Sequence, residues 1–424
     1  MKLRRLHQKA VVAAIAVTIT LAPVLASAAE VTFPAPAYTQ EDLSKVREWE
    51  KTWVGKKIDI TNIDQVAQFM PESYVKIFKD PQKWGAPPEG LYFYIVPYRQ
   101  IIETKGMIEA TRKYAPMVKT DADGKILNYD KIAGFPFPDP KSGLEIAYNM
   151  DFNTRGDSYV MRWKGNTVDP SRRTERKSNQ HFTEMYFIHR TDVDPKPVIP
   201  KNPDGFHKGQ FLEFFLPPEM NNSRMIAMRL TDESKDYINY LYYGEFRRIR
   251  RLSSAERTNA IDGTDLIYDD GNMWDGYLSS NTYTYKGKKE LLLGRHLDRK
   301  KTIRQPGQSM SNAYEFERCN TYVVDVASKD PHYIYSKRIW YLDPETYMIH
   351  WQEIYDKVGR FWKCCIQPTN NFKTAGGETK NFMSIFTIMD TQRFHSGETK
   401  IHVKGIGMEL SPKIFRLSNL QRSY

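Results

Sequence analysis

The chain has 424 residues, with 62 Lys and Arg against 51 Asp and Glu, which gives a formal net charge of +11. The net positive charge favours contact with anionic lipid or an acidic partner. The charges are mixed along the sequence and not gathered in blocks, and we expect no nucleic-acid partner. Three cysteines are too few for a disulfide framework. Aromatic residues make up 13% of the chain, which favours strands, because aromatic side chains suit a pleated, half-buried surface.

Residues 1–28 have the pattern of a cleavable secretory signal peptide. A basic start is followed by an apolar stretch from Ala10 to Leu21, and the small residues that end at Ala28 suit a signal peptidase. The alternative, a retained membrane anchor, is disfavoured because the stretch is shorter than the ~20 residues that a span needs. We expect cleavage near Ala28 and a location in the periplasm. Four basic residues lie in the signal, so the mature net charge falls to +7.

Residues 29–133 are expected to form an N-terminal helical region that packs on a sheet. Thr39 is a suitable N-cap, because the apolar residues behind it recur at helical spacing as far as Trp53. Gly55 ends this helix. Further expected elements are a short helix from Asn62 to Met70, a helix opened by Pro71, an apolar run from Leu91 to Val96 and a helix from Tyr98 to Tyr114.

From residue 134 to residue 424 the apolar period shortens to that of strands, and we expect one domain built on a large antiparallel sheet. Two tight turns are clear, since turn 343–346 has Pro344 second and turn 356–359 has Gly359 last. The strand between these turns has one apolar and one mixed face, so we expect it to be half buried. The expected strands are 183–188, 210–216, 225–230, 237–243, 246–252, 322–326, 333–342, 347–355 and 360–366.

Cysteines, histidines and nucleophile motifs form no catalytic or metal-binding pattern, so we expect neither an enzyme nor a cofactor. Cys319 can form a disulfide with Cys364 or Cys365 in an oxidising compartment, or all three can be buried thiols. There is no GxSxG elbow and no CxxC pair. The acidic stretch 262–271 lacks the closing Glu of an EF-hand, which favours a turn held by Asp side chains over a Ca²⁺ loop. The scattered histidines are His181, His189, His207, His296, His332, His350, His395 and His402.

The strongest charge feature is a run of four arginines, Arg247, Arg248, Arg250 and Arg251, around Ile249. On a strand these arginines alternate between the two faces, and their guanidinium groups match phosphates and carboxylates geometrically. The run can therefore clamp a lipid headgroup or an acidic partner. The alternative, which we prefer, is an exposed strand whose arginines pair with acidic residues on neighbouring strands, such as Glu245, Asp265, Asp269 or Asp270.

The stretch 134–140 combines three prolines with two phenylalanines. Prolines restrict the backbone, so this loop is expected to be stiff and to hold Phe135 and Phe137 at fixed positions. It can gate an apolar cavity. Alternatively, it is a rigid connection from the helical region into the sheet.

Four motifs together resemble a large Proteobacterial family of unknown function, whose members are often labelled outer-membrane-lipoprotein-sorting-like. The motifs are Gly134–Glu145, Phe246–Ser254, Asp262–Leu266 and Tyr335–Pro344, and the resemblance extends over roughly residues 60–415. It implies a fold similar to the periplasmic lipoprotein carriers, a curved antiparallel half-barrel with helices plugging its concave face and a cavity for acyl chains. It also implies a resistance–nodulation–division type exporter and an outer-membrane protein as partners. It implies no site residues.

We therefore predict a non-enzymatic periplasmic carrier that shields a lipid or another hydrophobic ligand between an inner-membrane exporter and the outer membrane. An acyl chain of about 16 carbons exposed to water costs on the order of 10 kcal/mol, so its transfer needs a shielded apolar pocket. Two alternatives stay open, a periplasmic hydrolase of lipid or glycan and an adaptor that binds envelope proteins through the arginines. The expected cavity-lining residues are Met225, Met228, Trp274, Tyr277, Trp340 and Trp351.

Overall fold

The computed structural model describes residues 36–85, 90–261 and 263–421. Most strands of the protein belong to one large sheet of 15 strands. The signal peptide predicted at residues 1–28 lies outside the described residues. The strands are β1 (Lys57–Ile58), β2 (Phe93–Ile95), β3 (Ser158–Val168), β4 (Thr174–Tyr186), β5 (Phe206–Leu216), β6 (Arg224–Leu230), β7 (Ile238–Tyr243), β8 (Arg248–Leu252), β9 (Asn281–Leu293), β10 (Tyr314–Ser328), β11 (Tyr335–Leu342), β12 (Ile349–Asp356), β13 (Phe361–Ile366), β14 (Thr369–Lys373), β15 (Thr379–Met383), β16 (Ile385–Asp390) and β17 (His395–Ile406).

Neighbouring strands of the large sheet are antiparallel, apart from β2, which runs parallel to β10. The order is β1-β2-β10-β11-β12-β13-β16-β17-β3-β4-β5-β6-β7-β8, with β9 paired to β10 outside this path. Strands β14 and β15 form a separate two-stranded sheet. The expected fold class, a mainly β protein with a large antiparallel sheet and an N-terminal helical part, is confirmed.

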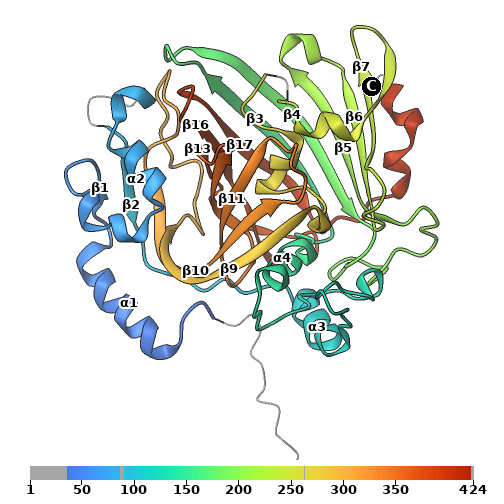
Figure 1. The fold of residues 1–424 in the computed structure, drawn as a ribbon, viewed down its shortest axis with the longest axis horizontal. Helices are drawn as coiled ribbons and strands as arrows, with labels where there is room; N and C mark the ends of the chain where they lie inside the picture. The colour runs from blue at the N-terminus through green and yellow to red at the C-terminus, as the bar shows by residue number, and fades with distance from the viewer. Residues whose placement is uncertain (1–35, 86–89, 262, 422–424) are drawn as a thin grey trace, which may run out of the picture. The chain divides into compact units, whose positions relative to one another are not determined.

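The sheet curves, and chain segments cover both of its sides (Figure 1). The α-helices are α1 (Gln40–Trp53), α2 (Glu72–Phe78), α3 (Lys105–Tyr114) and α4 (Gly143–Phe152). On one side, residues between 37 and 98 pack with β9–β13 around Trp351. On the concave side, α4 and the segment 253–280 between β8 and β9 pack around Trp340. Within the described residues, no helix has both the length and the apolar character that a membrane crossing requires.

Helix α1 begins and ends as its sequence predicts. The Thr39 hydroxyl accepts a hydrogen bond from the Asp42 amide at 3.1 Å, which satisfies one of the free amides of the first turn. Val46 is buried, and Trp49 stacks with Trp53 at 6.0 Å between ring centroids. Gly55 follows the helix at φ +81°, a conformation that favours glycine.

Three helix predictions differ from the structure. Residues 62–70 form two 3₁₀ turns instead of one helix, and the helix expected from Tyr98 begins only at Lys105. Thr104 caps that later start, because its hydroxyl accepts from the Met107 amide at 3.4 Å. Helix α4 falls in a region where only strands were expected, and the Ser142 hydroxyl caps it by accepting from the Glu145 amide at 3.2 Å. Local caps therefore decided both helix starts.

Strand β12 is buried on both faces, so the prediction of a half-buried strand is wrong. Trp351 points into the cluster that includes Tyr74 of α2, with ring centroids 4.7 Å apart. Ile349 and Ile354 point into the opposite cluster, on the side of α4. The residues that cover the second face of β12 lie far away in the sequence. The alternation of side chains within one strand does not reveal such a cover.

The cysteines are three buried free thiols. Cys319 lies on β10, whereas Cys364 and Cys365 lie on β13, with β11 and β12 between these strands in the sheet. Burial raises the pKa of the Cys364 thiol well above its usual value, which disfavours the reactive thiolate. The sequence left open a disulfide from Cys319 or three buried thiols, and the structure has the three buried thiols.

Candidate functional site

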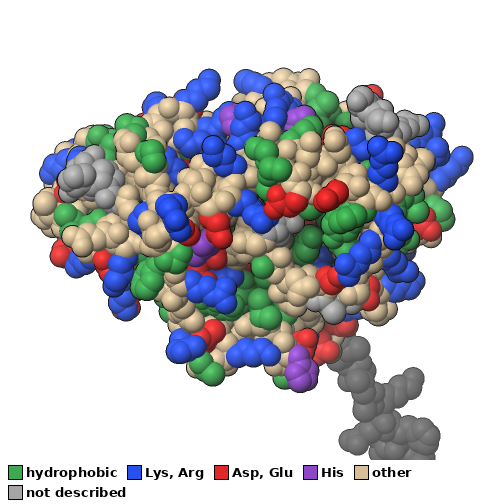
Figure 2. Space-filling view, turned by 90° about the horizontal axis from the view of Figure 1, so that it is seen from above, with side chains coloured by type: hydrophobic (Ala, Val, Ile, Leu, Met, Phe, Trp, Pro, Cys, Tyr) green, Lys and Arg blue, Asp and Glu red, His purple; other side chains and the backbone are tan. Residues whose placement is uncertain are grey.

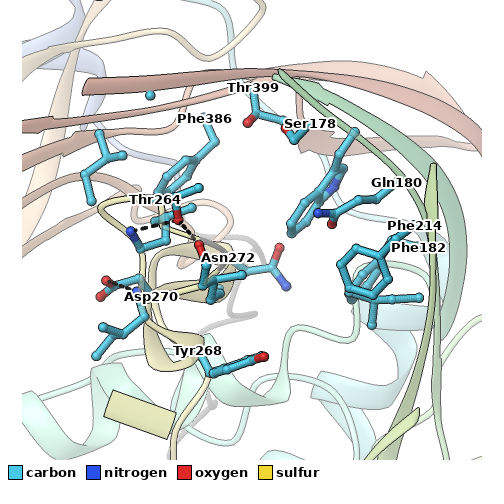
Figure 3. A pocket seen from close by; sticks show the side chains of 18 of the residues that line it. Ser178, Gln180, Phe182, Phe214, Thr264, Tyr268, Asp270, Asn272, Phe386 and Thr399 are labelled. Carbon is cyan, nitrogen blue, oxygen red and sulfur yellow. Dashed lines mark hydrogen bonds between the residues drawn. The ribbon is translucent and has the colours of Figure 1, made fainter. Parts of the chain in front are cut away.

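A cavity of about 140 Å³ lies between the concave face of the sheet and a stretch made up of Ile261 and residues 263–275, which we call segment 261–275. Alternate residues of β4, β5 and β17 line it, because successive side chains of a strand point to opposite faces. Figure 3 shows Phe182, Phe214 and Gln180 on the sheet side, across the cavity from Asn272. Most of the wall surface is apolar, and its apolar side chains are Trp163, Phe182, Leu212, Phe214, Pro217, Met220, Met225, Leu241, Ile261, Leu266, Ile267, Met383, Phe386, Ile388 and Ile401.

Two polar side chains of this wall carry acceptors without a partner. The Asn272 Oδ1 and Gln367 Oε1 atoms are buried and accept no hydrogen bond from the described residues. An unsatisfied buried polar group costs about 1–3 kcal/mol, so an O–H or N–H donor that enters the cavity is favoured there. The cavity is thus suited to a mainly apolar group that carries at least one donor.

Asp270 fastens the middle of the segment 261–275 to the sheet. Its Oδ1 atom accepts from Arg338 Nη1 at 2.6 Å, and its Oδ2 atom accepts from the Tyr335 hydroxyl at 3.0 Å. The same Oδ2 atom accepts from the Ile267 amide at 3.0 Å, which shapes the turn beside the cavity. Asp270 and Arg338 are both buried, so each depends on the other for charge compensation.

Asp275 fastens the end of the segment. Lys208 Nζ lies 2.9 Å from Asp275 Oδ1, and Gln210 donates to Oδ2 at 2.9 Å. Burial alone would raise the pKa of Asp275, but the nearby cations Lys208 and Arg257 lower it to about 2. Asp275 is therefore ionised at neutral pH and remains bound to Lys208.

His395 joins the start of the segment to β4. Its Nδ1 atom lies 2.5 Å from Asp265 Oδ2, and its Nε2 atom lies 2.6 Å from Glu175 Oε2. The hydrogen bond with Asp265 is the main cause that raises the pKa of His395 to about 9, and Glu175 adds to it. The imidazolium is thus the form present at neutral pH, and it holds two carboxylates together. Lys363 Nζ supports the same turn by donating to the Asp265 carbonyl at 2.6 Å.

We expect the His395 contact to stabilise the protein at neutral pH and to be lost in alkali. The pKa of His395 is raised from 6.5 to about 9 on folding, so its stabilisation is complete below pH 6.5 and disappears as the pH rises through 9. The His395→Gln variant should therefore lose about 1–2 kcal/mol at pH 6, after allowance for partial solvent exposure, and nothing at pH 10. Urea unfolding at both pH values measures this, with His332→Gln at an exposed histidine as the control. An equal loss at both pH values would contradict the assignment.

Of the six residues predicted to line the cavity, Met225 lies on its wall. Met228 points to the other face of β6 and packs in the cluster with Phe415. Trp274 and Trp340 pack on each other with ring centroids 5.7 Å apart. Tyr277 packs on the ring of Tyr237, and Trp351 lies in the cluster on the other side of the sheet. A ligand-binding role for these residues stays a prediction.

The phenylalanines of the proline-rich loop pack in the protein away from this cavity. Phe135 is fully buried against Tyr347, with ring centroids 4.9 Å apart. Phe137 lies beside Tyr148 of α4, and its amide donates to Asn149 Oδ1 at 3.0 Å. This position agrees with a rigid connection and does not bring the loop to the wall of the cavity.

The arginine run lies at an edge of the large sheet. Arg247 is in the turn before β8, with φ +51°, whereas Arg248, Arg250 and Arg251 are exposed on β8 itself. Among the described side chains, Arg250 pairs with Glu256, and the other three form no ion pair. Exposed cations on an edge strand also oppose edge-to-edge association of sheets, so partner contact through them stays a prediction.

Residues of the acidic stretch form ion pairs with arginines. Within the described residues, no group of three His, Cys, Asp or Glu side chains could hold a metal ion. Asp269 binds Arg257, in the same way that Asp270 binds Arg338. These pairs and the His395 contact could not be predicted from local patterns, because the two partners of each belong to separate elements.

A second cluster of ionisable groups is buried beside α4, apart from the cavity. The Tyr129 hydroxyl lies 3.3 Å from His207 Nδ1, and Asp151 pairs with Arg229 at 2.5 Å. Burial lowers the pKa of His189, which stacks on the Phe152 ring, to about 3. These histidines are neutral and packed in the interior.

Comparisons with known proteins place the chain in a family. It is 23% identical over 329 residues to the uncharacterized protein PA3922 of Pseudomonas aeruginosa, covering 72% of this chain and 67% of that protein. The crystal structure of a DUF1329 family protein from Desulfovibrio piger is 14% identical, with a TM-score of 0.46 over 66% of this chain and 98% of that one. A domain described as outer-membrane lipoprotein-sorting, from Vibrio parahaemolyticus, is 15% identical, with the same TM-score and coverage. The model of the family DUF1329, described as a protein of unknown function, matches residues 57–416, so this chain belongs to the DUF1329 family.

Proposed function

We propose that the protein is a non-enzymatic carrier that holds the apolar part of a lipid or another hydrophobic small molecule in the cavity under segment 261–275. The observation that carries this proposal is the largely apolar wall, with two unpaired acceptors, between a curved sheet and a separately fastened segment. In this proposal the protein works in the periplasm, between an exporter of the resistance–nodulation–division type and an outer-membrane acceptor. Such a carrier lowers the cost of moving apolar surface through water.

The volume of the cavity limits what fits without movement. A protein cavity of about 150 Å³ accommodates one benzene ring, so the 140 Å³ present here accommodates a ring or a short piece of an acyl chain. A complete acyl chain therefore requires that segment 261–275 moves away from the sheet. The contacts of Asp265, Asp270 and Asp275 oppose this movement and make the segment the expected lid.

A hydrolase is the alternative, and it needs a base and an orienting carboxylate within hydrogen-bond reach of the substrate. The described cavity wall contains the carboxylates Asp270 and Asp275, and both are bound to buried cations. None of the described residues of the wall is a histidine. This lining supports binding in preference to hydrolysis.

The Gly397→Leu variant tests the cavity directly. Gly397 lies on the wall in β17, and an added Cβ meets its nearest atoms at 3.6–3.8 Å, which is ordinary contact. The larger side chain should therefore enter the cavity without backbone strain and compete with the ligand. We expect at least a tenfold loss of affinity for the neutral hydrophobe N-phenyl-1-naphthylamine, measured by fluorescence titration.

The matched control is Gly376→Leu, which adds the same side chain in an exposed turn between β14 and β15. It should leave probe binding unchanged. Equal probe affinities in the two variants would reject the carrier. It would also be rejected if the unmodified protein bound no probe and native mass spectrometry found no hydrophobe after purification from its own cell envelope.

A further inference from the structure

A second hollow lies on the other face of the sheet, over β3, β4 and β17. This groove has a volume of about 430 Å³, within the ~300–1,000 Å³ that is usual for small-molecule sites. The loop 304–307 forms its opposite wall. Its charged residues are Lys164, Lys177, Arg304, Lys400 and the single carboxylate Glu398. Figure 2 shows that Lys and Arg side chains are common on the face seen from above.

The positions of the cations are unfavourable for an empty groove. Lys164 on β3 lies directly opposite Lys400 on β17, and Lys177 on β4 lies opposite Asn166, two residues along β3. Like charges directly opposite each other destabilise a sheet. Among the described residues, Lys164, Lys177 and Lys400 form no ion pair, and Lys400 only donates to the Thr302 hydroxyl at 3.0 Å. An anion between the strands would relieve this repulsion.

A buried donor of the groove also lacks a partner. Arg304 Nη2 is buried and makes no hydrogen bond with the described residues, although Nε donates to the Gln308 carbonyl at 2.8 Å. The Arg304 side chain is only 12% exposed, so its remaining N–H groups have limited access to water. The guanidinium group is held by this bond and by Glu398, whose Oε1 atom lies 4.0 Å from Nη1. The fork of a guanidinium group matches phosphate geometrically.

Glu398 is one carboxylate among four cations, so it offsets only part of their charge. Its oxygens accept from the Ser311 amide at 2.6 Å and from the Tyr314 hydroxyl at 3.0 Å, and its nearest Arg304 contact is 4.0 Å. Next to the groove, His402 lies on the same face of β17 as Lys400. Burial first, and then the cations Arg299 and Lys164, lower the pKa of His402 to about 4. The field on this face is therefore positive.

We propose that this groove binds a phosphate oxyanion, either that of a free organic phosphate or that of a phospholipid headgroup. Lys164, Lys177 and Lys400 supply charge from the floor of the groove, and Arg304 supplies directed N–H donors from its wall. The groove lies on the face opposite to the apolar cavity, so this proposal does not depend on the carrier function. A loss of phosphate binding and a loss of hydrophobe binding can therefore be told apart.

The triple variant Lys164→Gln/Lys177→Gln/Lys400→Gln removes the charges of the floor. Its matched control, Lys105→Gln/Lys119→Gln/Lys125→Gln, removes three exposed lysines elsewhere that form no ion pair among the described residues. Binding of glycerol 3-phosphate is measured by calorimetry, and binding to phosphatidylglycerol vesicles by sedimentation. We expect the affinity for the probe to fall about tenfold or more in the groove variant and to stay unchanged in the control. Binding by the unmodified protein should weaken as salt is added, and the groove variant should lose this salt dependence.

The two probes distinguish the sources of phosphate. Binding of glycerol 3-phosphate by the unmodified protein indicates a free organic phosphate, whereas binding confined to the vesicles indicates a membrane surface. Either result supports the proposed site, provided that the groove variant loses the binding that the unmodified protein shows. The groove variant should also unfold at an equal or higher urea concentration, because the like-charge pair is gone. No binding of either probe, or the same affinity in both triple variants, would overturn the proposal.

Discussion

Replacement of Arg295 by Met should destabilise the protein by about 3–5 kcal/mol, because it leaves buried carboxylates without their cation. Arg295 is fully buried. Its Nε atom lies 2.6 Å from Asp343 Oδ2, and Nη2 contacts Glu345. Nη1 lies 3.5 Å from Glu317 and donates to the Arg99 carbonyl at 2.9 Å. One guanidinium group therefore compensates three acids.

The same cluster connects the N-terminal region to the sheet. Glu345 accepts hydrogen bonds from the Ala37 and Ile101 amides at 3.0 and 2.8 Å, so its position depends on Arg295. Urea unfolding measures the loss, and Arg295→Lys should show an intermediate value because Lys keeps the charge without the planar fork. The control is Lys301→Met, whose pair with Glu315 is on the surface and should contribute less than about 1 kcal/mol. A loss at Arg295 as small as at Lys301 would refute the prediction.

Replacement of Arg338 by Met should have an effect of similar size, and it should also open the cavity. Arg338 is the buried cation that holds Asp270, so its loss leaves that carboxylate uncompensated and costs about 3–5 kcal/mol. The hydrogen bond from the Ile267 amide to Asp270 then loses its fixed acceptor, and segment 261–275 loosens. We expect lower stability together with faster uptake of N-phenyl-1-naphthylamine by the remaining folded protein, measured by stopped-flow fluorescence.

The double variant Arg338→Met/Asp270→Leu separates the two contributions. It removes both charges, so it should recover most of the stability while the segment stays loose. Arg360→Met breaks an exposed pair with Asp356 and serves as the control for the loss of an arginine. If the double variant is no more stable than Arg338→Met, the uncompensated charge is not the cause of the loss.

Local features of the fold could be predicted from the sequence because their causes are local. The Thr39 cap specifies the start of α1, and Pro344 and Gly359 specify the turns before and after β12. Helix α4 was missed because its cap, Ser142, follows a proline-rich stretch within a run of strand-like segments. Strand β12 is buried on both faces because residues between 37 and 98 cover one face and α4 lies on the side of the other. The sequence of β12 alone does not indicate these contacts.

The site was less predictable, because it depends on which strand face is inward and on what covers it. Met225 and Met228 are three positions apart on β6, an odd spacing that puts them on opposite faces. Only Met225 of this pair reaches the cavity. The large aromatic residues Trp340 and Trp351 fill the interior on the two sides of the middle strands, where burial is largest. The lid segment 261–275 was recognisable as an acidic stretch, but its cationic partners come from β5, β11 and β17 and from the segment 253–280.

The pairing of β17 with β3 has a consequence for how the chain folds. In this pairing Tyr159 lies opposite Ile406. Just beyond it, the Ser158 hydroxyl donates to the Met408 carbonyl, 250 positions later, and the Ala37 amide donates to Glu345 over 308 positions. Proteins dominated by such distant pairings fold slowly, because the entropy of closing long loops is lost before the contacts form. During synthesis β3 has one edge without its partner until the last strand has emerged. The nascent chain is therefore expected to expose this edge to other chains, and a delay in release of the C-terminus should promote aggregation.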